Sequence, residues 1–379
     1  MAALRRLPFR QATLSAVSLI GGISLAVIPV ATLSIASRTF ATTQQGYVSV
    51  VVTASTFIGQ LAFAALIESR LSSASTDRRV VFPQWLALFS VLASLAVAVT
   101  VDNPIVLCVA LPVLLASLEV GRGVSVAERL DRREAWAAVL VGLGALLGVG
   151  VAYLGAGWGF VPLVVGITGA TLVRSLPVAH TATTPELAVV GWVLTDVAIT
   201  GITYPVLNTF MLLLIGPVQA VLFTAISTVS GLLAIPLNFM RLRLLKAHST
   251  LDIWISTAAA LLAMIVIALL EFSGVLGFIF KGNWSVSSTA LALGVACVWR
   301  AASLATTLPF AALRRGGHVR LLAVLRGICA LATFIAGLAV IPLHSLVAVF
   351  GVMLLGEVAQ AITYETARRR IYRRAGSSS

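Results

Sequence analysis

Long apolar runs, separated by short polar or charged stretches, fill the chain almost from end to end. A helix needs about 20 apolar residues to cross the hydrocarbon core of a bilayer. Runs of this kind recur often enough to predict twelve membrane-spanning helices. They are expected at residues 12–37, 47–68, 82–101, 104–120, 136–154, 158–174, 187–212, 217–239, 251–270, 285–312, 319–340 and 343–364. The first run is too long for the apolar part of a signal peptide, which favours a retained helix.

The composition places the chain in the same class. Of its 379 residues 59% are hydrophobic and 10% are charged, with a mean hydropathy of +1.05. Soluble domains carry about 25% charged residues. The sequence therefore predicts an all-α, polytopic membrane protein.

The positive charges alternate between connections, which predicts an orientation. Cytoplasmic loops attract Lys and Arg. With twelve helices and a cytoplasmic N-terminus, Arg38 and Lys281 are the only basic residues of the connections that lie on the outer side of the membrane. The C-terminus is then also cytoplasmic. The net charge of +13 therefore reflects membrane topology, and no nucleic-acid partner is expected. The basic tail is expected to contact anionic membrane lipids.

The chain divides into two halves of six helices. The stretch "VVVTASTFIG" (50–59) resembles "LFTAISTVSG" (222–231) when one gap is allowed. We expect one bundle at 1–186, a second at 187–367, and a basic cytoplasmic tail at 368–379. Pro29 and Pro205 lie at matching depths, and a proline inside a helix permits a bend. Both are candidate hinges.

Ionisable residues inside apolar spans are energetically costly, so each one is a candidate functional residue. Arg300 lies near the middle of its predicted helix, and Asp196 lies about a third of the way along its own. The two either pair with each other or face a polar cavity. Gln60 and Asn208 either line that cavity or form hydrogen bonds between helices.

Other charged groups have simpler interpretations. Glu119, Arg326 and Glu357 lie near the cytoplasmic ends of their predicted helices and are expected to reach water with their polar tips. The stretch "GRGVSVAERLDRREAW" (121–136) is expected to be a solvated helical extension.

The sequence contains no motif of the common enzyme classes and no metal-binding pattern. The chain has no HExxH, GxSxG, P-loop or GxGxxG motif, and its longest predicted external loop has about fourteen residues, so we do not expect an enzyme. The three cysteines stand singly, without the spacing of a zinc site or a disulfide framework. No metal or cofactor is predicted.

Three stretches resemble a known family. "SRTFATTQQGYVSV" (37–50) resembles the first external loop of the polysaccharide-export flippases, relatives of the multidrug-and-toxin exporters, with matches at Arg38, Phe40, Gln45, Gly46 and Tyr47. "FIFKGNWSVSSTALAL" (278–293) and "LPFAALRRGGHVRLLAV" (308–324) resemble the two ends of that family's tenth helix. Gln45 stands where the family usually has an acid, which puts a role for that position in doubt.

The resemblance implies transport of a lipid-linked saccharide, typically on undecaprenyl pyrophosphate, from the inner to the outer leaflet of a prokaryotic cell membrane. Arg300 would hold the anionic headgroup at the midplane, and Arg38 would receive it near the exit. Asp196, Gln60 and Asn208 would complete the substrate site. Protons or sodium ions, and glycosyltransferases or a polymerase, would be partners.

Three alternatives remain open. An ion-coupled efflux carrier for small cations would need an acidic cavity, which Asp196 would supply. The loop "ESRLSSASTDRRV" (68–80) faintly resembles a basic loop of the major facilitator family. A non-transporting scaffold for saccharide assembly would have a sealed, apolar interior.

Overall fold

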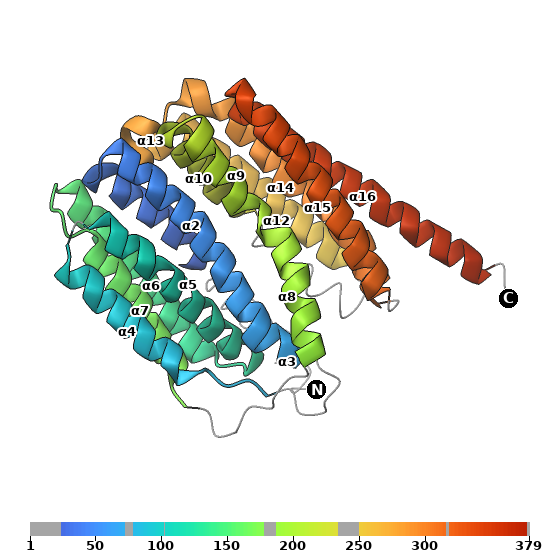
Figure 1. Ribbon diagram of the computed structural model, residues 1–379, viewed down its shortest axis with the longest axis horizontal. Coiled ribbons are helices and arrows are strands. Elements are labelled where there is room, and N and C mark those ends of the chain that lie inside the picture. Colours follow the sequence, from blue (N-terminus) through green and yellow to red (C-terminus); the bar gives the residue numbers. More distant parts are fainter. Residues whose placement is uncertain are drawn as a thin grey trace, which may run out of the picture. The chain divides into compact units, whose positions relative to one another are not determined.

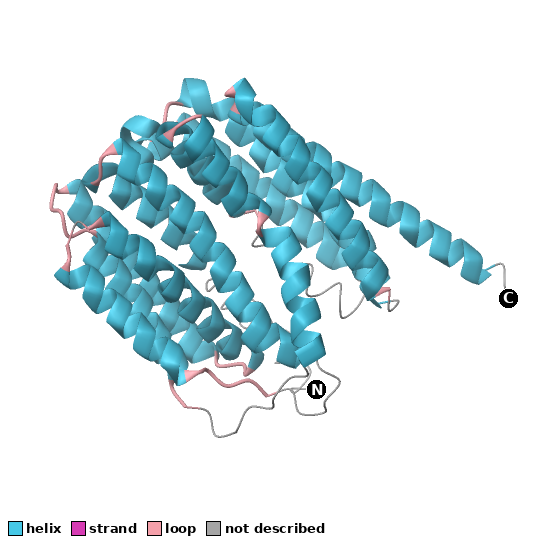
Figure 2. Cartoon of the chain, in the orientation of Figure 1, coloured by secondary structure: helices cyan, strands magenta, loops and turns pink. Residues whose placement is uncertain are grey.

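The computed structural model describes residues 24–72, 79–101, 103–177, 187–233, 250–315 and 318–376. Throughout this part of the chain the regular elements are helices, joined by short turns (Figures 1 and 2). The chain separates into two compact units, residues 1–205 and 206–379. The predicted start of the first helix lies outside the described residues, as do Arg5, Arg6, Arg10, Arg78, Arg241, Arg243 and Lys246.

The first unit is a bundle of helices whose direction alternates along the chain. Its described elements are the helix Ser24–Thr39, α2 (Thr42–Phe63), a π-helical turn at Ala64–Glu68, α3 (Ser69–Ser72), α4 (Gln84–Val99), α5 (Pro104–Ala127), α6 (Asp131–Tyr153), α7 (Phe160–Ser175) and α8 (Leu187–Gly201). α5 packs on α2, α4 and α7, while α6 packs on α7. The apolar core lies among these helices, with Leu111, Leu114 and Leu163 fully buried.

Local chemistry explains where several of these helices begin. The side chain of Asn103 accepts hydrogen bonds from the backbone amides of Ile105 (3.0 Å) and Val106 (3.3 Å), and Pro104 occupies the first helical position of α5. At the start of α2, the Gln44 side chain accepts a bond from the amide of Ala41 at 3.1 Å. α2 therefore begins at Thr42, five residues before the predicted start.

The second unit contains a second set of helices. They are α9 (Thr203–Leu214), α10 (Pro217–Gly231), α12 (Thr250–Phe272), α13 (Val275–Phe280), α14 (Val286–Arg315), α15 (Val319–Val340) and α16 (Leu346–Gly376). α14 packs along α16, which also packs on α15, and α10 and α12 pack on α14. α16 is longer than predicted and carries much of the basic tail in helical form (Figure 1).

One predicted helix is interrupted. The run at 187–212 forms α8 and α9, with a break at Ile202. Pro205 lies four residues after Gly201 and has no amide hydrogen to donate to that residue's carbonyl. The interruption therefore coincides with a candidate hinge. The proposed movement at Pro205, like that at Pro29 in the first helix, stays a prediction.

The described helices agree with the predicted spans. Seven are long and apolar enough to cross a membrane, and an eighth span results if the pair 257–272 and 275–283, bent by 66°, is counted as one. Four shorter apolar helices also match predicted spans, at Ser24–Thr39, Gln84–Val99, Phe160–Ser175 and Pro217–Gly231. Each of the twelve predicted helices thus has a counterpart in the described residues.

Candidate functional site

Arg38 closes the first helix and bonds to the preceding turn of that helix. Its Nη1 donates to the Ser34 carbonyl at 3.0 Å and lies 3.1 Å from the Ser34 hydroxyl. Its guanidinium lies 5.9 Å from the centre of the Tyr153 ring at the end of α6. The half-buried Arg38 is thus held at the end of the first unit where the predicted outer connections gather.

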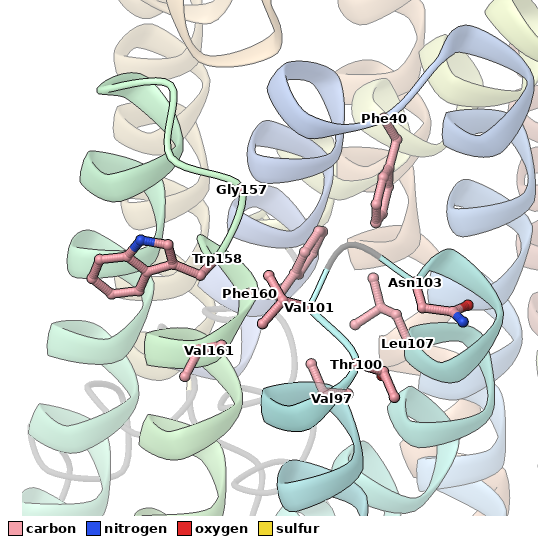
Figure 3. A pocket seen from close by; sticks show the side chains of 10 residues that line it. All are labelled: Phe40, Val97, Thr100, Val101, Asn103, Leu107, Gly157, Trp158, Phe160 and Val161. Carbon is pink, nitrogen blue, oxygen red and sulfur yellow. The ribbon is translucent and has the colours of Figure 1, made fainter.

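Three predicted outer connections meet at this end and line a small hollow (Figure 3). Phe40 comes from the first connection, Thr100 and Asn103 from the second, and Gly157 and Trp158 from the third. The hollow has a volume of about 10 Å³, which is room for roughly one water molecule. It is too small for a saccharide.

Two residues of the family-like first loop are structural anchors. Phe40 is buried and stacks on Phe160 with a centroid distance of 5.3 Å. Gln45 is also buried, and its Nε2 donates to the Phe40 carbonyl at 2.7 Å. The amide at the position of the family's usual acid therefore fixes the turn into α2.

The other candidates of the first unit lie on or near α8. Asp196 is half-buried on α8. Gln60 is an exposed residue of α2. If a Cβ atom is placed on Gly201, it lies 3.5 Å from the Oε1 of Gln60. Gln60 therefore lies beside the C-terminal end of α8. A pair between Asp196 and Arg300 would join the two units and stays a prediction.

A buried ion pair in the first unit escaped the sequence analysis. Arg174 is fully buried on α7, and its Nε and Nη2 donate to Glu134 at 2.9 and 2.7 Å. Arg122 lies 3.8 Å from the same carboxylate. Glu134 is 2% exposed, so the prediction that the stretch 121–136 is solvated was wrong. α6 begins at Asp131, and this places Glu134 inside the bundle.

Glu119 belongs to the same cluster. Glu119 lies close enough to Arg122 and Arg174 to interact with them electrostatically. Its side chain also approaches α2: a Cβ atom placed on Gly59 would lie 3.2 Å from the Cγ of Glu119. Glu119 therefore packs between α5 and α2, and the expectation that its polar tip simply reaches water was wrong. The cluster thus contains the carboxyl groups of two glutamates and the guanidinium groups of two arginines.

Arg300 is the centre of a second charged cluster, in the second unit. It lies fourteen residues into α14, about 21 Å from the start of the helix at 1.5 Å per residue. Its guanidinium lies 4.1 Å from the ring centre of Trp299. The Trp299 ring lies 6.3 Å from Phe350, which stacks on Phe223 at 5.3 Å. Arg300 is thus half-buried and held against a buried aromatic group.

Glu357 of α16 lies in the same cluster. Its Oε1 accepts a hydrogen bond from the buried Thr306 hydroxyl of α14. Arg300 and Arg326 both act on this carboxylate electrostatically. Glu357 is eleven residues, or about 16 Å, from the start of α16. It is therefore held by α14 deep along its helix, and the expectation of a simple contact with water was wrong.

Arg326 of α15 completes this group. Its guanidinium lies 5.5 Å from the ring centre of Phe310, and Phe310 packs against the fully buried Tyr364. The expectation that Arg326 only reaches toward water was therefore incomplete. Together Arg300, Arg326 and Glu357 form what we call the arginine–glutamate triad, with two positive charges and one negative charge.

Asn208 forms a hydrogen bond between helices. It is fully buried on α9, and its Nδ2 donates to the Thr224 hydroxyl of α10 at 2.8 Å. Thr224 in turn donates to the Ala220 carbonyl at 3.1 Å. This geometry is the interhelical alternative that the sequence analysis left open.

A buried carboxylate organises the bend after α12. Glu271 is 2% exposed and accepts hydrogen bonds from the Trp284 indole (2.7 Å) and the Thr289 hydroxyl (2.8 Å). Both of its oxygens thus have partners inside the second unit. Among the described residues no group of three or more His, Cys, Asp and Glu side chains is placed to hold a metal ion.

Sequence comparisons identify no relative. No model of a known protein family matches the chain, and no curated protein matches it.

Solved structures of transporters, in contrast, match nearly the whole chain. One is described as the outward-facing conformation of a multidrug resistance MATE family transporter of the MOP superfamily, with 14% identity, 95% and 94% of the two chains covered, and a TM-score of 0.54. Another is the inward-facing conformation of such a transporter, with 13% identity, 96% and 99% coverage, and a TM-score of 0.55. A third, a MATE protein in complex with MaD3S, has 13% identity, 96% coverage of each chain and a TM-score of 0.56.

Identities this low establish the fold alone. They confirm the prediction of an all-α, polytopic membrane protein with twelve helices in two bundles. The positions of the termini relative to the membrane stay a prediction. The chain is a multi-pass membrane protein with the two-lobed, twelve-helix fold of the MATE transporters.

Proposed function

We propose that this protein is a transporter of the MOP superfamily that works by alternating access and carries a lipid-linked anionic saccharide from the inner to the outer leaflet. The observation that carries the proposal is the arginine–glutamate triad. Its two arginines lie inside apolar helices, where a charge is energetically costly, and this makes both of them candidate functional residues. Arginine binds phosphate through several donors at once, which suits a pyrophosphate headgroup.

The fold supports the mechanism. Structures with this fold have been described in inward-facing and outward-facing conformations. In the proposed cycle Arg300 holds the headgroup at the midplane, and Arg38 receives it near the exit. Gln60 and Asp196 contact the polar cargo, and Pro29 and Pro205 are the hinges. Asn208, which the sequence also offered as a substrate contact, instead fixes α9 to α10. The lipid chain stays in the bilayer.

The setting follows from the cargo. Undecaprenyl pyrophosphate is the lipid carrier that we propose, and a prokaryotic inner membrane is the site of action. Glycosyltransferases or a polymerase would supply and consume the saccharide. A negative interior drives an anion outward by about 2.3 kcal/mol per charge and 100 mV, and protons or sodium ions would provide further coupling.

A second candidate function is ion-coupled efflux of small cationic compounds. Two observations favour it: some solved structures of the same fold are described as multidrug resistance transporters, and Asp196 supplies a half-buried carboxylate. This function would depend on Asp196 rather than on the arginines.

Transport by the Arg300→Ala variant is the central test. In proteoliposomes that contain a fluorescent polyprenyl-pyrophosphate saccharide, we expect the rate of flipping to fall at least about tenfold, because a headgroup contact is lost. Arg300→Lys should retain part of the rate, since it keeps the charge but loses the planar donor pair.

Arg320→Ala is the matched control, because Arg320 is an exposed residue at the start of α15. A wild-type rate in Arg300→Ala would remove Arg300 from the mechanism. A different result would support the efflux carrier. In that case the wild-type protein would take up a cationic dye but not flip the saccharide lipid, and Asp196→Asn would abolish the dye uptake.

A further inference from the structure

Glu271 is a buried carboxyl group that the proposed function does not use. It lies in the last turn of α12, just before the 66° bend, and is 2% exposed. We propose that Glu271 is a proton-binding site at this bend of the second unit, and that it exchanges one hydrogen bond with Thr289 as the proton binds and leaves. The site is defined by hydrogen bonds within one unit, and only its role in transport rests on the proposed function.

The hydrogen-bond partners of Glu271 are neutral groups. Its Oε2 accepts from the Nε1–H of Trp284 at 2.7 Å, and its Oε1 lies 2.8 Å from the hydroxyl oxygen of Thr289. Trp284 is buried and stacks on Phe280 with 5.1 Å between the ring centres, and Thr289 is fully buried. Burial of a charge without a partner of opposite sign is costly. A proton, which neutralises the carboxylate, is therefore a suitable ligand.

The charged and titratable residues of the surrounding elements do not pair with Glu271 within the described chain. Lys281, in the turn after α13, is exposed. Cys297 and Arg300 lie eleven and fourteen residues into α14, about 16 and 21 Å from its start. Asp252 lies at the opposite end of α12, and α10 has no charged residue.

The Thr289 hydroxyl allows two arrangements of its hydrogen. Its oxygen lies 2.8 Å from the Oε1 of Glu271 and 2.7 Å from the carbonyl oxygen of Ser285. A hydroxyl has one hydrogen, so it donates to one of these oxygens at a time. When it donates to Ser285, its own oxygen can accept a hydrogen bond from a protonated Glu271. The Ser285 carbonyl accepts the backbone amide of Thr289 at 2.9 Å in both arrangements.

Proton binding is therefore an exchange in which each polar group keeps a partner. One proton from the medium binds to the Oε1 of Glu271, and the charge of the group changes from −1 to zero. The Thr289 hydrogen turns to the Ser285 carbonyl, the new O–H donates to the Thr289 oxygen, and Trp284 continues to donate to Oε2. Hydrogen bonds to an ionised group are roughly twice as strong as neutral ones. The ionised state thus ties α12 to Trp284 and Thr289 more firmly than the protonated state.

The site lies close to solvent. Residues 272–275, which directly follow Glu271, are exposed and belong to a connection that the sequence predicts on the outer side of the membrane. A proton from that side would have a short path to the carboxyl group. In a transporter, loosening of the α12 bend by protonation would make the transport rate depend on the external pH.

Infrared spectroscopy of the purified protein in detergent tests the site directly, because a protonated carboxyl group and a carboxylate absorb at different frequencies. We compare wild type with Glu271→Gln, which keeps the shape of the side chain and imitates the protonated state. In a titration from about pH 4 to pH 9, the difference between the two spectra should show one protonated carboxyl group at low pH and one carboxylate at high pH. A group that keeps one charge state over this whole range would overturn the proposal.

Thr289→Val is the second variant, because it removes the hydroxyl and nearly keeps the shape. The ionised form loses a charge-assisted hydrogen bond and the protonated form loses a neutral one, so the midpoint of the titration should rise by about one pH unit. Glu365→Gln is the matched control: Glu365 pairs with Arg368 and Arg369, and the group it removes should titrate independently of Thr289. If Glu271→Gln fails to fold, identical titrations of wild type and Thr289→Val would overturn the proposal equally.

Transport assays separate the site from the proposed function. In proteoliposomes with a fluorescent polyprenyl-pyrophosphate saccharide, the flipping rate of wild type should depend on the external pH, and Glu271→Gln should lose this dependence. If neither protein flips the lipid while Glu271 titrates, the proposed transport function is refuted and the proton site stands. If Glu271→Gln flips the lipid with the pH dependence of wild type, the role of this site in transport is refuted.

Discussion

Replacement of Arg174 by methionine is expected to destabilise the first unit severely. The change leaves Glu134 buried with its two short hydrogen bonds removed, and Arg122, at 3.8 Å, lies beyond hydrogen-bond distance. Breaking a buried ion pair from one side costs about 3–5 kcal/mol. Thermal unfolding of the purified protein in detergent should show a large fall in Tm, with poor recovery from the membrane.

The double variant with Arg174→Met and Glu134→Leu separates charge from packing. Replacement of a whole buried pair by apolar groups is often neutral. The double variant should therefore recover most of the stability, while Arg132→Met, at an exposed position of α6, should have little effect. This account of the pair would be contradicted if Arg174→Met lowered the Tm only slightly, or if the double variant were as unstable as the single one.

Replacement of Gly144 by leucine is expected to separate α6 from α7. A Cβ on Gly144 would lie 2.6 Å from the Pro162 carbonyl oxygen and 2.9 Å from the Cα of Gly166. Both atoms belong to the backbone, so neither can move aside cheaply. Overpacking costs about 1–3 kcal/mol even for an added methylene in a core, and leucine is much larger. The thermal stability in detergent should fall strongly.

Gly142→Leu provides the comparison on the same helix. A Cβ on Gly142 has no atom within 4 Å, so this variant should retain wild-type stability apart from small differences in helix propensity. Gly148, which faces the Gly159 carbonyl at 2.6 Å, should respond like Gly144. Equal tolerance of leucine at 142 and 144 would show that the close approach of α6 and α7 is not required.

The glycine contact shows what a sequence signal can and cannot provide. The spacing of Gly144 and Gly148 matches the GxxxG pattern of close helix packing in membranes. That pattern could have identified the contact surface on α6. It could not identify α7 as the partner, nor choose between Gly142 and Gly144, because this depends on how each helix is rotated about its axis.

The buried ion pair was missed for a different reason. Hydropathy places a helix boundary at the first cluster of charges. Arg174 therefore fell at the end of a predicted helix, and Glu134 fell in the stretch before one. In the structure α6 begins at Asp131 and α7 includes Arg174, and the two charges neutralise each other inside the bundle. A possible signal was Gly121, where a Cβ would lie 3.1 Å from Arg174. This glycine provides room for the arginine.

The sequence by itself determined the number and approximate limits of the twelve helices and the class of membrane protein. Burial of about twenty apolar residues in lipid is a property of each segment alone, and it needs no knowledge of neighbours. The break near Pro205 also follows from local chemistry, since the missing amide hydrogen is fixed by the residue itself.

Only the tertiary structure decided which charged residues share a cluster. Glu357, Arg300 and Arg326 stand on three helices and are up to 57 residues apart in sequence, and Glu134 meets Arg174 across 40 residues. Whether such a charge reaches water, pairs or forms a site depends on the faces that packed helices present to one another. Those faces are set by side-chain packing across the bundle, which the apolar pattern of single segments does not contain.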